Sequence, residues 1–260
     1  MNAIFLTVKT DSSRLPKKAL LPIGNETSTL QFLIKRLKKR FNTQNIIVCT
    51  TDRSIDDQVV EIAVKNSVNV FRGSLDKLER WLAACKKFDV EFFVTVDGDD
   101  LFCDPSLISM AFAQYENNKS IDFIHSTQVV TGGFSYAIKR DALAKVCDIK
   151  NTHETEMMWV YFTQTNMFNV VELEHVDAAL CDDNVRLTLD YDDDYRCFQA
   201  IIAHFEKRET EYSLHDIVPY LKNNKHIANI NLHRQEDWKK NQAQNTKLVL
   251  KTIETQAHSK

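Results

Sequence analysis

The sequence predicts an α/β protein built on a single, mostly parallel sheet with helices on both faces. Short β-rich runs alternate with amphipathic helical patterns through the first half of the chain. Segments between these runs are long enough for the crossovers of about a dozen residues or more that parallel pairing needs. The 260 residues, 43% of them hydrophobic, are also enough to bury a core without disulfides or structural metal. Because ligands of such sheets bind beyond the carboxyl ends of the strands, we expect the chemistry in the loops that follow them.

The first half contains four runs that we interpret as buried strands. They are rich in apolar and β-branched residues and cover Ala3–Val8, Ile46–Thr50, Val68–Phe71 and Phe92–Val96. Between them, apolar residues recur at helical spacing in three segments, Leu30–Leu37, Ile55–Ala63 and Leu75–Cys85. Thr27 or Ser28 can cap the first of these helices.

The second half is less regular and predicts a smaller subregion of mixed strands. The expected strands are Ile121–His125, Phe134–Ile138, Phe168–Leu173 and Arg186–Leu189. The expected helices are Asp141–Cys147, Glu154–Phe162, Asp192–Phe205 and a polar tail helix over Glu236–Thr255. We predict one domain over residues 1–205 and a helical extension over residues 206–260 that packs on it or on a partner chain.

Composition and charge narrow the class of protein. A net charge of −3 and a pI near 6.2 give no basic footprint for non-specific nucleic-acid binding. The N-terminal apolar run is too short for a signal peptide or a membrane span. Six singly spaced cysteines, several of them in apolar runs, indicate free thiols in a reducing compartment. We therefore expect a cytoplasmic protein without nucleic-acid or membrane partners, and a homodimer is compatible with the sequence.

The loop after the first strand carries four cations, several hydroxyl groups and a proline. A nucleoside triphosphate needs such donors around its phosphates, on a loop that a proline stiffens. A solvated basic loop is the alternative that composition alone leaves open. The order of the residues favours phosphate binding, and it reads Val8-Lys9-Thr10-Asp11-Ser12-Ser13-Arg14-Leu15-Pro16-Lys17-Lys18.

This loop resembles the first loop of the SpsF-like and acylneuraminate–ketodeoxyoctonate cytidylyltransferases, which reads roughly A-R-x-x-S-x-R-L-P-x-K. Lys9 replaces the first arginine of that pattern, and Asp11 stands where a glycine is usual. The matching residues are Ser12, Arg14, Leu15, Pro16 and Lys18. The resemblance implies a Rossmann-like, GT-A-like nucleotidyltransferase fold. It also implies catalytic cations at Lys9, Arg14 and Lys18 and nucleotide contacts at Val8, Ser12 and Ser13.

Two acidic motifs resemble further parts of the same family. Asp97-Gly98-Asp99 follows the fourth strand in a segment similar to T-G-D-x-P-L-I-D-P, and residues 186–194 are similar to R-L-T-V-D-T-P-E-D. The resemblance implies that Asp99 and Asp190 bind Mg²⁺, that Asp99 is also catalytic, and that Asp97 contacts the nucleotide. One or two carboxylates with phosphate oxygens suit this hard cation. Asp192–Asp194 are better explained as caps of the following helix.

The remaining candidates lie in three loops. The segment Arg72-Gly73-Ser74 resembles the family's F-R-G-S, which implies contacts with the nucleotide base and ribose; a plain helix cap is the alternative. The resemblance also suggests acceptor contacts, in positions where ordinary surface or core residues remain the alternative, at His125, Gly132, Gly133, His153 and Glu154. Glycine is scarce, with five residues where average usage predicts about 18, and four of the five lie in the loops proposed for nucleotide, metal and acceptor.

The resemblance covers residues 2–200 and implies a Mg²⁺-dependent cytidylyltransferase. Such an enzyme transfers CMP from CTP to an acidic acceptor, a ulosonic or sialic-like sugar acid or a phosphorylated or phosphonate compound, and releases pyrophosphate for surface glycan or related synthesis. Two alternatives stay open. Asp97-Gly98-Asp99 also spells the D-x-D of metal-dependent glycosyltransferases, and the departures at Lys9 and Asp11 are compatible with a non-catalytic nucleotide-binding relative.

Overall fold

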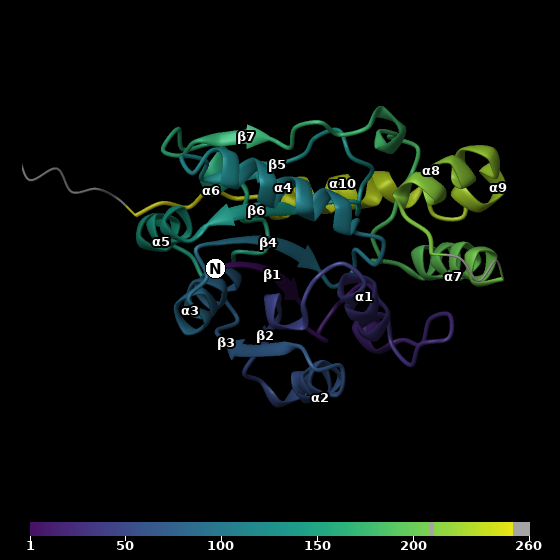
Figure 1. Cartoon of the computed structure of the whole chain (residues 1–260), viewed down its shortest axis with the longest axis horizontal. Coiled ribbons are helices and arrows are strands. Elements are labelled where there is room, and N and C mark those ends of the chain that lie inside the picture. The colour runs from purple at the N-terminus through teal and green to yellow at the C-terminus, as the bar shows by residue number, and fades with distance from the viewer. Residues whose placement is uncertain (208–210, 252–260) are drawn as a thin grey trace, which may run out of the picture.

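The computed structural model describes residues 1–207 and 211–251 and contains a seven-stranded mixed sheet. In Figure 1 the sheet runs from β7 at the top to β3 at the bottom. The strand order is β3-β2-β1-β4-β6-β5-β7, and β3, β2, β1 and β4 are mutually parallel. The strands are β1 (Asn2–Thr7), β2 (Ile46–Thr51), β3 (Asn69–Gly73), β4 (Phe92–Asp97), β5 (Phe123–His125), β6 (Tyr136–Lys139) and β7 (Val170–Glu172). The predicted fold class is confirmed.

The second half of the chain supplies the mixed part of the sheet. β6 runs antiparallel to both β4 and β5, whereas β5 and β7 are parallel. These three strands are short, as expected for the less regular half.

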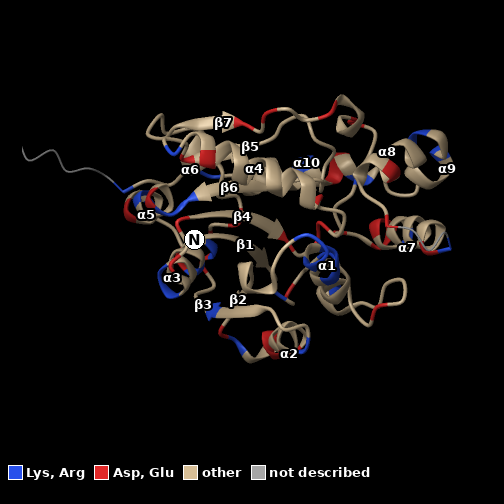
Figure 2. Ribbon diagram, viewed as in Figure 1, with Lys and Arg blue, Asp and Glu red and all other residues tan. Residues whose placement is uncertain are grey.

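Helices cover both faces of the sheet. One face packs against α1 (Thr29–Lys38), α2 (Asp57–Lys65), α4 (Pro105–Asn117), α7 (Asp192–Glu206) and α8 (Leu214–Asn223). The other face packs against α3 (Lys77–Phe88), α5 (Arg140–Ile149) and α6 (Val160–Thr163). Alternation along β1 explains this, since Ile4 and Leu6 enter the first core and Ala3 and Phe5 enter the second. Charged residues of both signs are scattered over the helices and loops, while β1 and β2 carry none (Figure 2).

The register of β1 and β4 brings their following loops together. Thr7 pairs with Asp97, and the amide of Gly98 donates to the Thr7 carbonyl at 2.9 Å. A Cβ on Gly98 would lie 2.9 Å from the Val8 side chain, so glycine allows this close approach. The loop after β1, which starts at Val8, and the loop after β4, which carries Gly98 and Asp99, therefore start side by side at the carboxyl edge of the sheet.

Two expected elements are wrong. Residues 186–189 do not form a strand, because their amides pair with loops: Leu187 donates to Thr131 at 2.8 Å and Leu189 to Asp99 at 2.9 Å. The helix expected over Glu154–Phe162 starts only at Val160. The Thr155 hydroxyl instead bonds to the first turn of α3, an alternative to local helical hydrogen bonds.

Two helices, α4 and α8, were not among the elements that the sequence predicts. Asp104 accepts a hydrogen bond from the amide of Ser106, and Pro105 occupies the first turn, which together start α4. Ser213 and Asp216 form the capping box of α8. The apolar side of α8 enters the larger core, so part of the predicted 206–260 extension is packed on the domain. The boundary at residue 205 stays a prediction.

The tail helix is shorter than expected. α9 (Lys225–Ala228) is followed by α10 (Arg234–Asn245), and the chain then becomes extended. The extended segment pairs with the end of α5, where Asn151 donates to the Val249 carbonyl at 2.8 Å. Residues 252–255 of the expected helix lie outside the described residues. Among residues 1–207 and 211–251, the helices are too short or too polar for a membrane span, and all six cysteines are free.

Candidate functional site

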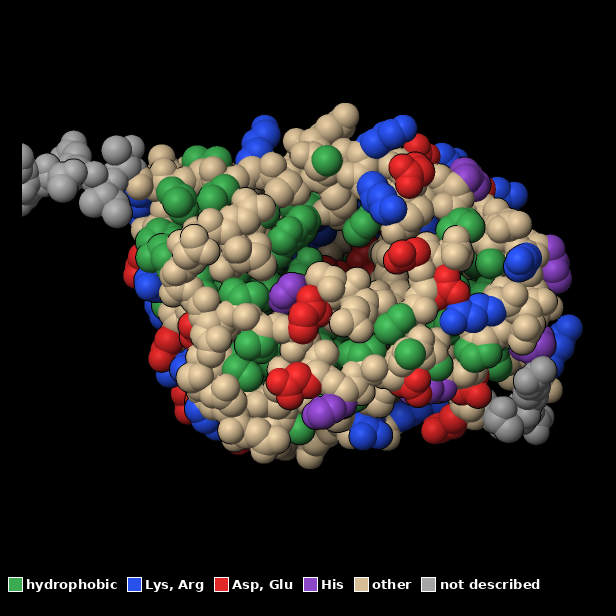
Figure 3. Space-filling model, turned by 90° about the horizontal axis from the view of Figure 1, so that it is seen from above, with side chains coloured by type: hydrophobic (Ala, Val, Ile, Leu, Met, Phe, Trp, Pro, Cys, Tyr) green, Lys and Arg blue, Asp and Glu red, His purple; other side chains and the backbone are tan. Residues whose placement is uncertain are grey.

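Segments that are distant in the sequence line one cleft of about 1020 Å³ at the carboxyl edge of β1 and β4. Its walls come from the loops after these two strands, the start of α3, residues 126–136 and 153–159, the segment before α7, and α10. Charges of both signs are interspersed on the face drawn in Figure 3, and this face is hollowed near its middle. The mixture of charges agrees with the low net charge of the sequence.

The centre of the cleft contains two cations and two carboxylates from four separate positions. The Lys18 ammonium lies 2.7 Å from Asp99 Oδ2 and 2.9 Å from Asp190 Oδ1. The Arg14 guanidinium lies 2.7 Å from the same Asp190 oxygen. Asp190 is only 1% exposed, and Lys18 is 13% exposed. The fold thus brings together the two cations and the two acids that the motifs single out.

The charges in this group stabilise one another. Burial alone would lower the pKa of Lys18, but the carboxylates of Asp99 and Asp190 outweigh it and raise that pKa above its ordinary value. Burial likewise opposes ionisation of Asp99, yet Lys18 holds the pKa of Asp99 below its ordinary value. Lys18 therefore stays an ammonium at neutral pH, and Asp99 stays ionised beside it.

The donor set fits the divalent cation expected here. Two carboxylates reach the same cationic nitrogen, so both can face one positive centre, and oxygen ligands of this type suit Mg²⁺. Phosphate oxygens and water would supply the remaining ligands of an octahedral ion. Asp99 and Asp190 could therefore hold a divalent metal at this position, with Lys18 and Arg14 beside it.

Asp190 is positioned by residues that the motif analysis did not assign to the site. Arg186 Nη2 lies 3.4 Å from Asp190 Oδ2, and Arg186 Nε lies 2.9 Å from Asp194 Oδ1. Asp194 Oδ2 in turn accepts the amide hydrogens of Asp190 and Tyr191. Asp194 thus caps α7, as expected, and also orients Asp190. The spacing of Arg186, Asp190 and Asp194 by four residues was the available signal.

The two departures from the family pattern are paired with opposite charges. Asp11 lies 2.7 Å from Arg53, which neutralises a carboxylate at an otherwise unfavourable place beside phosphate. Lys9 lies 2.7 Å from Glu156. Burial would raise the pKa of Glu156, but Lys77 and Lys9 hold it below its ordinary value. Lys9 therefore faces the cleft as one half of an ion pair.

Lys77 is a cleft residue that the sequence interpretation missed. It lies at the start of α3, is 7% exposed, and places its ammonium 2.9 Å from Asp97 Oδ1 and 5.0 Å from the centre of the Trp81 ring. Burial and then the neighbouring Asp99 raise the pKa of Asp97, although Lys77 opposes this. The available signal was a lysine within the apolar stripe of that helix.

Asp100 also lies in the cleft, deeper than its neighbours. It is 9% exposed and accepts a hydrogen bond from the Ser135 hydroxyl at 3.2 Å. Burial, and then the charges of Asp99 and Asp97, raise the pKa of Asp100 well above its ordinary value.

The other predicted contacts are divided between the cleft and places outside it. Val8, Ser12, Ser13, Gly132, His153 and Glu154 line the cleft. Among the described residues, those that line it do not include Arg72, Gly73, Ser74, His125 or Gly133. Arg72 instead bonds to the carbonyls of Thr51 and Arg53. Ser74 accepts the amide hydrogen of Asp76, and His125 faces Glu172 at 3.6 Å. Their ligand contacts stay predictions.

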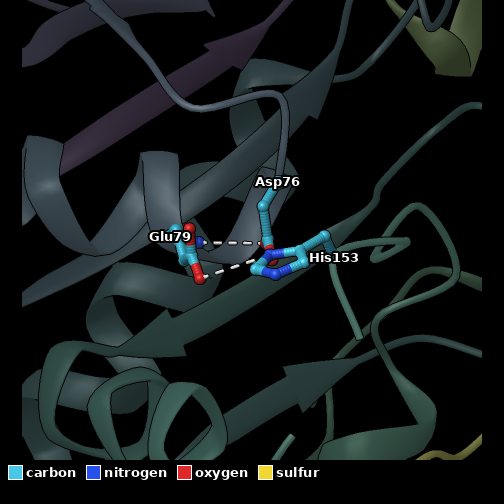
Figure 4. Close-up of side chains that lie close together, drawn as sticks. All are labelled: Asp76, Glu79 and His153. Atoms are coloured by element: carbon cyan, nitrogen blue, oxygen red, sulfur yellow. Dashed lines mark hydrogen bonds and ion pairs between the residues drawn. The ribbon is translucent and has the colours of Figure 1, made fainter. Parts of the chain in front are cut away.

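A second group of potential metal ligands lies at the start of α3. Figure 4 shows His153 approaching Asp76 and Glu79, with its Nδ1 at 3.6 and 3.8 Å from their carboxylates. The Lys150 ammonium already lies 2.6 Å from Asp76 and 3.1 Å from Glu79. Asp76 also accepts the amide hydrogens that start the helix. We therefore interpret this group as a capped and charge-balanced helix start.

Comparisons with known proteins agree with the geometry. A family model described as cytidylyltransferase matches residues 4–247. The spore coat polysaccharide biosynthesis protein SpsF of Bacillus subtilis is 22% identical, over 88% of this chain and 98% of its own. A cytidylyltransferase structure from Leptospira borgpetersenii is 30% identical with a TM-score of 0.78, over 87% of this chain and 96% of that one.

A more distant structure extends the likeness of fold. CMP:2-keto-3-deoxy-manno-octonic acid synthetase, solved in complex with CTP, aligns with a TM-score of 0.59 at 14% identity. The alignment covers 80% of this chain and 99% of that one.

Proposed function

This chain belongs to the cytidylyltransferase family, and from that premise we propose that it transfers CMP from CTP to an acidic acceptor with release of pyrophosphate. One observation carries the proposal. Arg14 and Lys18, from the loop after β1, meet Asp99 and Asp190 in a single cleft. An in-line displacement at phosphorus requires cations that bind phosphate and carboxylates that can bind a metal ion, all at one point.

The cations bind the part of CTP that leaves. Arg14, with its planar fork, and Lys18 contact the β- and γ-phosphates and stabilise the charge that develops on pyrophosphate. The Lys9 ammonium, which pairs with Glu156 when CTP is absent, also contacts these phosphates when CTP is bound. Asp99 and Asp190 would hold Mg²⁺, which would supply positive charge to the phosphate oxygens when bound. Lys18 can exchange its two carboxylate partners for phosphate oxygens of CTP.

The acceptor is the less specified substrate. An acceptor hydroxyl, phosphoryl or phosphonyl oxygen attacks the α-phosphorus from the side of the cleft formed by residues 126–136 and 153–159. Lys77 and Arg80 line the same cleft and are cations suited to an acidic group. The likeness to SpsF, named for spore coat polysaccharide biosynthesis, supports an acceptor that is used in surface polysaccharide synthesis.

The glycosyltransferase alternative has less support. Membership of the cytidylyltransferase family argues against it. In addition, the Asp97 carboxylate of the D-x-D sequence pairs with Lys77 at 2.9 Å, whereas Asp99 and Asp190 share the Lys18 ammonium, so Asp97 lies outside the pair of carboxylates that can face one positive centre.

Pyrophosphate release from CTP, with Mg²⁺ and a panel of ulosonic acids, phosphorylated sugars and phosphonates, tests the proposal. We expect release with at least one acceptor, and its loss in Asp99→Ala and Asp190→Ala with an unchanged circular dichroism spectrum. Asp192→Ala, an exposed carboxylate two residues from Asp190, is the control and should keep full activity. Full activity in both Asp99→Ala and Asp190→Ala would contradict the assignment of these two residues as metal ligands. CTP binding without turnover would indicate a non-catalytic relative.

A further inference from the structure

Helix α10 faces the cleft with an uncharged, hydrogen-bonding surface. Trp238, Asn241, Gln242 and Asn245 line the cleft and are spaced by three, four and seven residues from the first. This spacing puts them on one side of a helix. The surface therefore consists of one indole and three carboxamides, in contrast to the charged groups that line the centre of the cleft.

This helix is fixed at both ends. At its start, Arg234 lies 2.8 Å from Asp193, and Gln235 donates to the Thr131 hydroxyl at 3.1 Å. Beyond its end, Lys251 donates to the Ile149 carbonyl at 2.8 Å, in the extended segment that pairs with the end of α5. α10 is thus a wall of the cleft, bridging the segment before α7 and the end of α5.

The Gln242 carboxamide has hydrogen-bonding capacity that the described part of the protein does not use. Gln242 Oε1 is buried and has no hydrogen-bond partner among the described residues. Most buried polar atoms are paired, so an unpaired acceptor on a residue that lines a cleft indicates a missing donor. Asn241 Oδ1 accepts from Arg14 Nη1 at 3.3 Å, which places this wall next to the phosphate-binding cations.

We propose that α10 is a wall of the acceptor site and binds hydroxyl groups of the acceptor. This inference rests on the proposed cytidylyl transfer. Carboxamides both donate and accept, as hydroxyl groups do, and they carry no charge that would compete for phosphate. The Trp238 ring offers an apolar surface to the C–H face of a sugar. The hydrogen bond that Gln235 donates to Thr131 ties α10 to residues 126–136, which we assign to the acceptor side of the cleft.

Steady-state kinetics on the full chain test the wall. Acceptor probes are 3-deoxy-manno-octulosonic acid, N-acetylneuraminic acid and the hydroxyl-poor 2-aminoethylphosphonate, each with CTP and Mg²⁺. We expect turnover with a sugar acid, and an acceptor KM about fivefold higher in both Gln242→Ala and Asn245→Ala, the effect of one lost neutral hydrogen bond. The KM for CTP should change less than twofold. Gln244→Ala, an exposed glutamine on the same helix, is the matched control.

The other outcomes separate the two proposals. A rise in the KM for CTP instead of the acceptor assigns α10 to the nucleotide and overturns the inference, as do unchanged constants in both variants. Turnover with aminoethylphosphonate alone overturns the hydroxyl-binding role of α10 but leaves cytidylyl transfer intact. No turnover with any probe, while CTP still raises the melting temperature, overturns both the transfer and the role of α10 drawn from it.

Discussion

At the scale of single residues, Lys18 occupies the position between Asp99 and Asp190 that a divalent cation would share. Its ammonium lies within 2.9 Å of an oxygen of each. In Lys18→Met the two carboxylates lose this cation, so MgCl₂ without nucleotide should stabilise the variant more than the wild type. A free Mg²⁺ concentration of ten times its Kd corresponds to a stabilisation of about 1.4 kcal/mol. Melting temperatures in EDTA and in MgCl₂ measure the difference.

Two further variants make the Lys18 prediction specific. Lys17→Met removes an exposed neighbouring charge and should respond to MgCl₂ as the wild type does. Adding Asp190→Asn to Lys18→Met should remove the extra response. An equal response of Lys18→Met and the wild type would contradict a shared cation position.

Gly132 is a second residue whose identity is dictated by its surroundings. Its φ is +87°, and an added Cβ would overlap the Leu187 carbonyl oxygen. Because backbone is the obstacle, Gly132→Ala should lower the free energy of unfolding by about 3 kcal/mol or more. Gly24→Ala, also at positive φ, meets side chains rather than backbone and should be less destabilising. Urea unfolding measures both, and equal losses would contradict the argument.

At the scale of elements, Asp56 joins the loops after β1 and β2. It is fully buried and accepts the amide and hydroxyl hydrogens of Thr10 at 2.8 and 2.7 Å, and the hydroxyl hydrogen of Thr51. Burial would raise the pKa of Asp56, but these hydrogen bonds, first that of Thr51, lower it below its ordinary value. Ionised Asp56 therefore holds the loop after β1 at Thr10 against the end of β2 at Thr51.

The lowered pKa of Asp56 gives its stabilisation a defined pH dependence. A depressed pKa stabilises the fold above the unfolded value of about 3.9, and this contribution is lost as pH falls through the folded value. Asp56→Asn should cost about 2 kcal/mol at pH 7, the range for hydrogen bonds to a charged group. The wild-type and variant stabilities should converge below about pH 4. Urea unfolding from pH 7 to 3 measures this, with exposed Asp52→Asn as the control; a pH-independent difference would refute it.

The local sequence pattern predicts those strands that pair with neighbouring strands along their whole length. The first four strands are apolar runs paired along their length, so their positions follow from sequence alone. Residues 186–189 look the same locally, yet their hydrogen bonds go to loops at Thr131 and Asp99. Thr155 similarly bonds to α3 instead of continuing a helix. These errors arise where tertiary partners decide the backbone conformation.

At the scale of the whole molecule, the site combines positions that no local pattern relates. Arg14, Asp99 and Asp190 were predicted through ordered motifs, and the sheet brings them together. Lys77 was missed because a lysine in an apolar stripe is usually solvated, and here it reaches Asp97. The place of α10 depends on chain folding beyond residue 206 and had no sequence signal except a polar helix carrying Trp238. Motif order therefore predicts which residues meet at the centre of the cleft, and tertiary structure adds the walls of the cleft.

The start of the same wall is held to the rest of the cleft by charged side chains. α10 has no buried residue, and its start is fixed by Arg234, which pairs with Asp193 and Asp237 and lies 4.9 Å from the centre of the Tyr191 ring. Since such partly exposed ion pairs add little to global stability, Arg234→Ala should change the free energy of unfolding by less than about 1 kcal/mol. The helix itself should open more often.

Amide hydrogen exchange over residues 234–245 measures that opening directly. We expect faster exchange there in Arg234→Ala, with rates in the strands unchanged. Arg196→Ala is the matched control, because Arg196 pairs with the same Asp193 but belongs to α7, and it should leave exchange in α10 as in the wild type. Exchange in α10 that is insensitive to Arg234 would mean that the cleft wall is held by the extended segment after it, through the pairing of Val249 and Lys251 with residues 149–151.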